Sequence, residues 1–264
     1  MDYSSYKGLK IERNGRILTV TIDRPEVKNA VNPLIHGEFA RIFGDIAQDH
    51  DVGVVILTGA GQVFSAGGDI GWLAALQSDP AATVAAIEND RRIQNSMLDL
   101  EVPVIARVVG PAIGLGCSLS LFCDFVYATP DARFADPHVS VGLVAGDGGA
   151  VIWPQLIGYA RAKRYLLTGD PITGAEAAAI GLITEAVPLD EIDARVQAMA
   201  ERLAAGATNA IKWTKASINA GLKVTANAII DRAAAYENLT MLMEDHRIAV
   251  AAFQNRSTPQ FTGR

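Results

Sequence analysis

The chain has 264 residues, of which 50% are hydrophobic and 20% are charged, so it contains enough apolar material for a large buried core. Its formal net charge of −6 argues against a nucleic-acid-binding protein, which would need a basic face. Residues 1–16 lack the apolar centre of a signal peptide, and no apolar run is long enough for a membrane span. We therefore expect a soluble, cytoplasmic, globular protein without a membrane partner.

The first half of the chain reads as strands and helices in alternation. Asn14-Gly15 between two short apolar runs is typical of a hairpin turn. Strand–helix alternation implies parallel pairing with right-handed crossovers. The predicted elements are strands over 10–12, 17–22, 54–58 and 103–108, a helix over 33–48 with Asn32 as its N-cap, and a helix over 80–100.

The second half is predicted to be mainly helical. Strands are expected over 125–128 and 183–187, and alanine-rich helices from Leu189 onward, with breaks near Gly206 and Gly221. We predict an α/β fold with a core over residues 1–200 and a helical region over 201–264. The helices between the two strands are expected over 148–156, 161–167 and 174–179.

The cysteines and most of the histidines carry little chemical signal. Cys117 and Cys123 have neither CxxC spacing nor the pattern of a disulfide framework, so buried free thiols are expected. His36, His50 and His246 lie in polar helical contexts and are predicted at the surface. No grouping of His, Cys, Asp and Glu has metal-ligand spacing, so no metal site is predicted.

Two glycine-rich stretches each follow a buried strand, and they are the main candidates for a functional site. One runs from Gly59 to Gly68, and the other from Gly110 to Gly116 leads into a helix. Backbone N–H groups at such a helix start have no partner and can hold negative charge, including a transient oxyanion. The structural alternative is that these glycines only permit tight turns.

Several segments resemble the crotonase, or enoyl-CoA hydratase/isomerase, superfamily, in the family's order from about residue 10 to the end. The resemblance implies a crotonase-type ββα spiral core with a C-terminal helical oligomerisation region in a homotrimer or homohexamer. The sequence alone leaves open a helical cap on the chain's own core. The segments are FSAGGDI (64–70), GPAIGLGCSLSLFCD (110–124) and LLTGDPITGAEAAAIGLI (166–183), with weaker similarity in IDRPEVKNAVN (22–32) and EDHRIAVAAFQNR (244–256).

The resemblance also implies the substrate and how it is held. An acyl-CoA thioester or related small carbonyl compound would bind, with coenzyme A as part of the substrate and no permanently bound cofactor. The oxyanion hole would be formed by the backbone N–H groups of Ala66 and Leu115. The residues implied in coenzyme A binding are Lys28, Ala30, Gly68, Asp69 and Ile70, together with Phe253 and Arg256, which would reach a neighbouring subunit's site.

Each of these implied roles has an alternative. Asp69 is expected to cap or anchor its loop rather than act as a catalyst, and Lys28 and Arg256 would otherwise be solvated surface charges. A dinucleotide site is rejected, because Phe64 stands where the third glycine of GxGxxG belongs.

The residues at the two acid–base positions depart from the family's hydratases. Those enzymes carry one glutamate after the Gly-Cys of the second loop and another after a downstream proline, whereas this chain has Ser118 and His138. A turn at Gly142 or Gly146 could fold Asp147 onto His138, and a His held by an Asp is a recognised general base. The alternative for Asp147 is a cap of the following helix.

Three functions are therefore compatible with the sequence. The first is an acyl-CoA-processing enzyme that stabilises a thioester enolate and uses His138 and Asp147 for proton transfer or water activation. The second is a carbon–carbon hydrolase of a β-diketone or β-ketoacyl-CoA, since PH followed by GDG resembles the β-diketone hydrolase branch of the superfamily. The third is a catalytically silent acyl-CoA-binding protein.

Overall fold

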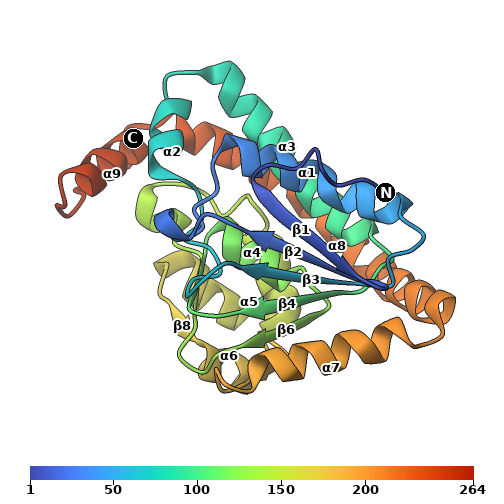
Figure 1. Ribbon diagram of the computed structural model, residues 1–264. Helices are drawn as coiled ribbons and strands as arrows, with labels where there is room; N and C mark the ends of the chain where they lie inside the picture. Colours follow the sequence, from blue (N-terminus) through green and yellow to red (C-terminus); the bar gives the residue numbers. More distant parts are fainter.

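A six-stranded sheet forms the centre of the computed structural model, which describes residues 1–264 (Figure 1). The first two strands form the predicted hairpin, with Gly15 at a φ of 58°, and all the later pairs are parallel, as predicted. The strand order is β1 (Leu9–Asn14), β2 (Ile17–Ile22), β3 (Val54–Gly59), β4 (Val104–Val108), β6 (Phe125–Ala128) and β9 (Glu185–Ala186).

Helices cover both faces of this sheet. Because successive side chains on a strand point to opposite faces, Val55 and Leu57 of β3 join the larger apolar core, while Val54 and Ile56 pack toward α7. The helices are α1 (Pro33–Gln48), α2 (Ile70–Leu76), α3 (Pro80–Asp99), α4 (Leu115–Leu121), α5 (Gly149–Thr168), α6 (Gly174–Ala179), α7 (Ile192–Ala204), α8 (Thr208–Met241) and α9 (Glu244–Gln254), with 3₁₀ turns η1 (Pro25–Val27) and η2 (His138–Val141).

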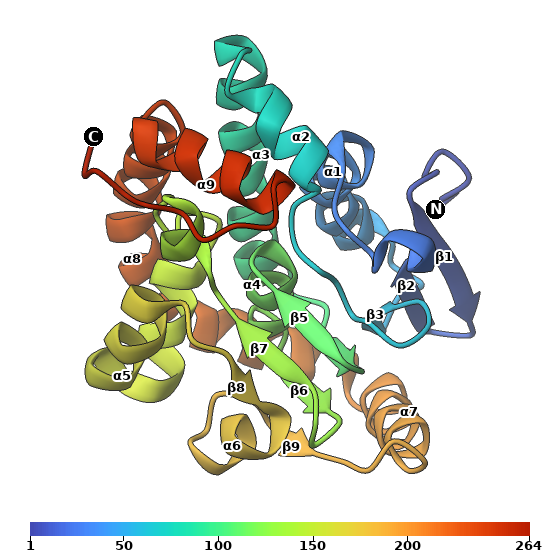
Figure 2. The same ribbon diagram turned by 90° about the vertical axis from the view of Figure 1, so that its left-hand side faces the viewer.

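A second, three-stranded sheet lies beside the glycine loops (Figure 2). It contains β5 (Pro111–Ile113), β7 (Arg133–Ala135) and β8 (Ile172–Thr173), and β5 pairs in parallel with β7. β5 directly precedes α4, and β7 directly precedes the segment that carries His138. This sheet therefore brings the second glycine loop next to the predicted catalytic histidine.

The C-terminal helical region is confirmed, with one difference from the prediction. α8 runs through Gly221 without a break, because the cost of about 1 kcal/mol for one glycine is small beside the packing of α8 on α3. The predicted break between the helices over 148–156 and 161–167 is present, because α5 is interrupted at Gly158, whose φ is 76° and ψ is 158°. A boundary after residue 200 would fall inside α7.

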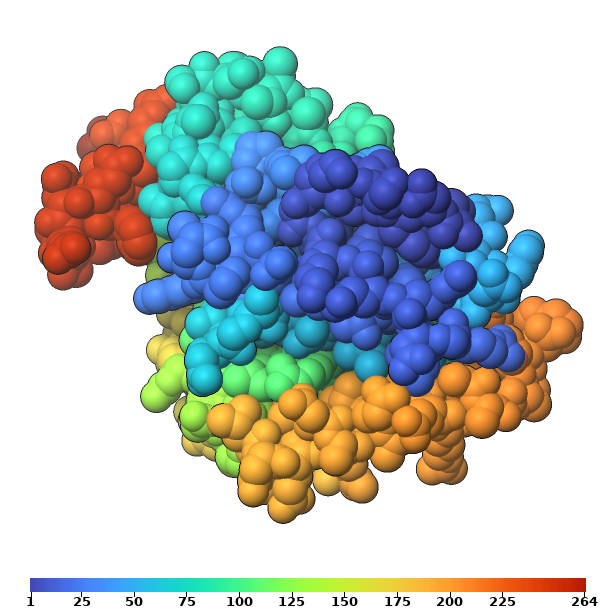
Figure 3. All heavy atoms as spheres, viewed as in Figure 1, coloured from blue at the N-terminus to red at the C-terminus, as the bar shows by residue number.

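The end of the chain extends from the body of the molecule. Figure 3 shows the last segment, in red, projecting beside the segment around α2.

The predicted cap Asn32 accepts a hydrogen bond from the Ile35 amide at 3.0 Å, which confirms that assignment. None of the helices combines the length and the apolar character that a membrane span requires.

Candidate active site

A cavity of about 130 Å³ lies where the two glycine loops meet η2 and α8. Gly68 comes from the first loop and Leu115 from the second. Much of the remaining wall is apolar and comes from α2, α3 and α8. The polar residues on its wall are His36, Asp90, His138, Asp147 and Glu237.

The two loops are held together by backbone hydrogen bonds. The Ser65 amide donates to the Pro111 carbonyl, and the Ile113 amide donates to the Ser65 carbonyl, both at 3.0 Å. Gly67 has a φ of 83°, and a Cβ added there would lie 2.8 Å from the Ile113 oxygen. A side chain at this position would therefore force the loops apart.

The structure corrects one of the two predicted amide donors. The Ala66 amide already donates to the Lys28 carbonyl oxygen at 3.0 Å, so it is not free for a ligand. The amide of Gly68 has no acceptor within the chain, and Gly68 also lines the cavity. Leu115 is the first residue of α4, so its amide has no acceptor within the helix. Gly68 and Leu115 thus each present a free amide at the cavity, one from each loop.

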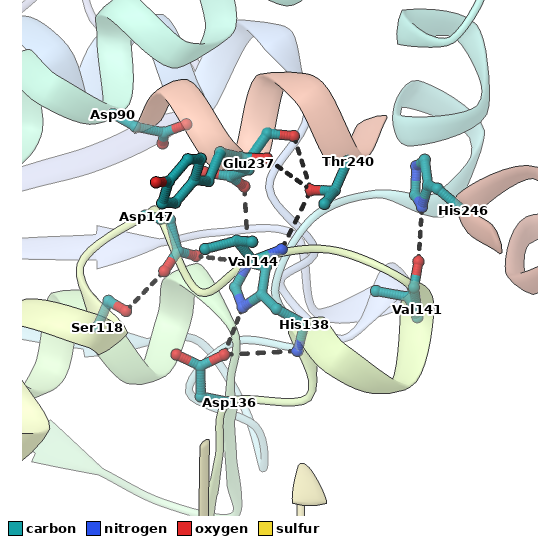
Figure 4. A network of polar contacts seen from close by, with 12 residues as sticks. Asp90, Ser118, Asp136, His138, Val141, Val144, Asp147, Glu237, Thr240 and His246 are labelled. Carbon is teal, nitrogen blue, oxygen red and sulfur yellow. Dashed lines mark hydrogen bonds and ion pairs between the residues drawn. The ribbon is translucent and has the colours of Figure 1, made fainter. Parts of the chain in front are cut away.

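His138 lies between carboxylates that come from three different segments (Figure 4). Its Nδ1 hydrogen-bonds to Asp136, and its Nε2 lies 3.3 Å from Asp147 Oδ2 and 3.9 Å from Glu237 Oε1. Ser118 donates a hydrogen bond of 2.9 Å to the other oxygen of Asp147. Gly148, not Asp147, occupies the N-cap position of α5. The predicted meeting of His138 and Asp147 is therefore present.

The carboxylates set the protonation of this cluster. Burial alone would lower the pKa of His138, but Asp147 and Asp136 outweigh it and hold that pKa well above its ordinary value. Burial raises the pKa of Asp147, yet the neighbouring imidazolium and hydrogen bonds lower it overall. Burial raises the pKa of Glu237 well above its usual range. The surroundings therefore favour the cation of His138, the anion of Asp147 and the uncharged form of Glu237.

Sequence reasoning missed two members of this cluster. Asp136 stands two residues before His138 in ADPH, so its closeness in the chain was an available signal. Glu237 lies on α8 and had no local signal, because only the folding of that helix over the core brings it to the cavity.

Two of the three histidines predicted at the surface are buried. His36 is 2% exposed and His246 is 1% exposed, whereas His50 is exposed as predicted. His36 Nε2 lies 2.7 Å from Asp90 Oδ1, and His246 Nδ1 hydrogen-bonds to the Val141 carbonyl at 2.7 Å. Polar neighbours in the chain predicted exposure, but in the interior a partner from another element bonds one nitrogen of each ring.

The His138 cluster also brings together side chains of the types that bind metal ions. Their spacing in the sequence did not predict this grouping. Donor atoms of Asp136, His138 and Asp147 lie within 4.8 Å of one another. Both ring nitrogens of His138, however, face carboxylates within the cluster. We therefore interpret these contacts as an ion-paired hydrogen-bond chain.

The residues implied in coenzyme A binding are divided by the structure into two groups. Gly68 and Ile70 line the cavity, next to Asp69. Lys28 and Ala30 follow η1 beside this loop, where the Ala66 amide donates to Lys28 and Arg24 donates to the Ala30 carbonyl. Phe253, which is 60% exposed, and Arg256 lie at the end of α9 and do not line the cavity.

Asp69 is the N-cap of α2, as predicted. Its Oδ1 accepts hydrogen bonds from the amides of Gly71 and Trp72 at 3.0 and 3.3 Å. We expect Asp69→Ala to lower the free energy of unfolding by about 1 kcal/mol, because two helix-start amides lose their acceptor. Urea denaturation measures this change. Asp69→Asn keeps a capping oxygen and is the control, and an equal loss in both variants would contradict the assignment.

Replacing Asp147 by asparagine is expected to lower the pKa of His138, because the largest favourable charge beside the ring disappears. The wild-type pKa lies above the ordinary value of 6.5, so the ring charge stabilises the fold below about pH 6.5. That contribution is lost as the pH rises through the folded pKa, and the loss should begin at lower pH in Asp147→Asn. NMR titration of the His138 Cε1 proton measures the shift, and an unchanged midpoint would exclude the pairing.

The sequence and the structure of the chain are similar to those of known proteins. Residues 12–264 match the family model described as Enoyl-CoA hydratase/isomerase. The chain is 33% identical to a short-chain-enoyl-CoA hydratase of Clostridium acetobutylicum, over 96% of this chain and 97% of that protein. An enoyl-CoA hydratase/isomerase structure from Mycobacterium paratuberculosis has a TM-score of 0.91 at 36% identity, covering 94% of this chain and 99% of that one.

A solved β-diketone hydrolase is also similar. This protein, from the cyanobacterium Anabaena, is bound to (S)-3-oxocyclohexyl acetic acid and has a TM-score of 0.85 at 29% identity. The match covers 91% of this chain and 96% of that chain. The crotonase-type fold expected for the chain is thus confirmed by its structural neighbours.

Proposed function

Because the chain belongs to the enoyl-CoA hydratase/isomerase family, we propose that it is an enzyme that processes an acyl-CoA thioester through an enolate. The observation that carries this proposal is a single cavity that holds the free amides of Gly68 and Leu115 together with His138. Coenzyme A enters as part of the substrate, and no resident cofactor is required.

The two amides stabilise the charge that develops on the thioester oxygen. Backbone donors fixed by two loops need no reorganisation when the enolate forms, and each is worth on the order of 3 kcal/mol in such holes. Support for this role comes from the loop-to-loop hydrogen bonds and from the close approach of Gly67 to Ile113.

His138 and Asp147 move the protons. Asp147 is ionised and accepts a proton from a water or from a substrate carbon, while the His138 imidazolium donates one. Asp136 fixes the ring through Nδ1, which leaves Nε2 toward Asp147. Since Ser118 and His138 stand at the two hydratase glutamate positions, hydration of a simple enoyl-CoA is expected to be slow.

A carbon–carbon hydrolase is the second candidate, favoured by the His138–Asp147 pair and by the similar β-diketone hydrolase. In that reaction Asp147 takes a proton from water as the hydroxyl attacks the ketone carbonyl. The carbon–carbon bond then breaks, and its electron pair forms an enolate in the amide hole. His138 returns a proton to the enolate carbon, so one water is consumed and an acid is released.

A substrate panel tests these functions against a catalytically silent acyl-CoA-binding protein. Loss of enoyl absorbance reports turnover of crotonyl-CoA, and mass spectrometry reports the opening of a cyclic β-diketone or β-ketoacyl-CoA. Turnover that disappears in His138→Ala supports an enzyme, and the substrate consumed decides between the two reactions. Binding without turnover of any member would leave the silent protein.

We also propose that the helical tail forms the interface of a cytoplasmic homotrimer or homohexamer. Large apolar side chains on α8 and α9 are exposed, including Ile218 at 70%, Val224 at 74% and Phe253 at 60%. Light scattering after size-exclusion chromatography measures the mass, and a monomer would contradict this proposal.

A further inference from the structure

His36 and Asp90 form a buried polar pair on the cavity wall, apart from the His138 cluster. His36 lies on α1 and Asp90 on α3, with exposed fractions of 2% and 8%, and both residues line the cavity. The His36 ring also packs against Trp72, with ring centroids 4.9 Å apart. The pair is thus held by α1 and α3, whereas His138, Asp147 and Glu237 lie on other segments.

This pair retains hydrogen-bonding capacity that the protein does not use. His36 Nε2 and Asp90 Oδ1 meet at 2.7 Å, but His36 Nδ1 and Asp90 Oδ2 have no hydrogen-bond partner within the chain. Glu237 Oε2, on the same wall, is fully buried without a partner, whereas His36 Nδ1 and Asp90 Oδ2 are not fully buried. Because both residues line the cavity, a bound ligand could supply the partners that the chain does not. A purely structural role, in which the pair only joins α1 to α3, would account for the 2.7 Å hydrogen bond. It would not account for the two polar atoms that have no partner.

The charges around the cavity restrict the group that would satisfy these atoms. Asp90 and Asp147 place two carboxylates on the wall of one small space, so a further anionic group would be repelled. A hydroxyl group can donate to Asp90 Oδ2, and a carbonyl group can accept from His36 Nδ1 where that nitrogen carries a hydrogen. Both are uncharged oxygen groups.

We propose that His36 and Asp90 recognise an uncharged oxygen substituent, a hydroxyl or carbonyl group, on the acyl chain of the bound thioester. This inference rests on the proposed acyl-CoA function and adds the substrate class to it. Chains with such an oxygen are then preferred over plain hydrocarbon chains, and chains that end in a carboxylate are rejected.

Calorimetric binding of unreactive thioesters tests the inference without requiring turnover. The probes are butyryl-CoA, 4-hydroxybutyryl-CoA, pentanoyl-CoA, 4-oxopentanoyl-CoA and succinyl-CoA. We expect the hydroxy or the oxo compound to bind about tenfold more tightly than its plain partner, and succinyl-CoA to bind most weakly. The compound that binds more tightly than its plain partner shows whether a hydroxyl or a carbonyl group is recognised.

Two cavity variants and one surface variant separate recognition from a structural role. In His36→Phe the tenfold ratio should fall toward one. Asp90→Asn keeps the shape of the side chain but removes its charge, so succinyl-CoA should bind this variant more tightly than it binds the wild type. Loss of a purely structural contact between the two helices would not raise that affinity. His50→Gln, at an exposed histidine, should keep the wild-type ratios.

Equal wild-type affinities for plain and oxygen-bearing chains, or ratios unchanged in both cavity variants, would overturn the inference and leave the proposed function standing. If no thioester binds at all, the proposed function fails together with it.

Discussion

The variant His138→Ala is expected to lose turnover by roughly 100- to 10,000-fold, whichever substrate of the panel the wild type consumes. Without the ring, the cationic proton donor beside Asp147 is gone, and Asp147 loses the charge that keeps it ionised when buried. Initial rates with saturating substrate give the change in kcat. Acyl-CoA affinity should change much less, because the amide hole does not include this side chain.

The exposed His50 supplies the matched control for this loss. His50→Ala removes the same side chain outside the cavity and should leave the rate unchanged. His138→Gln tests whether a neutral polar side chain is sufficient, and it should remain nearly as impaired as alanine, since it carries no titratable proton. A His138→Ala enzyme that is within threefold of the wild type would exclude His138 from the chemistry.

Leu115→Pro is expected to lower kcat by about 100- to 1,000-fold, because proline removes one amide donor from the hole. Leu115 is the first residue of α4, a position where proline is compatible with a helix and where the amide has no helical partner. Circular dichroism and thermal unfolding should therefore show a folded protein.

Leu115→Ala separates the amide from the side chain. The leucine side chain is 7% exposed and belongs to the main core, so either substitution costs some stability. Only the proline removes the N–H group. A rate loss in Leu115→Ala as large as in Leu115→Pro would show that packing, and not the hydrogen bond, is responsible.

Local sequence patterns predicted most of the architecture because the relevant signals are short-range. The Asn14-Gly15 hairpin, the Asn32 and Asp69 caps and the buried β3 all depend on residues a few positions apart. Glycine spacing placed the two loops beside a cavity, since a strand, a tight turn and a helix start can be recognised in order. The parallel sheet followed from the alternation of strands and helices.

The details of the site depend on contacts between distant elements, which local patterns do not contain. The loop containing Ala66 was located correctly, but whether its amide is free depends on the Lys28 carbonyl, which lies in another turn. Glu237 reaches the cavity only through the course of α8. Burial of His36 similarly depends on Asp90, from a helix that follows much later in the chain.

A crystal structure with a non-hydrolysable acyl-CoA enolate analogue tests the central claim most directly. The measured quantities are the distances from the analogue's carbonyl oxygen to the amide nitrogens of Gly68 and Leu115. Both should be about 2.7–3.1 Å, with His138 facing the reacting carbons. An oxygen that lies beyond hydrogen-bond reach of either amide, or a thioester bound outside this cavity, would contradict the account.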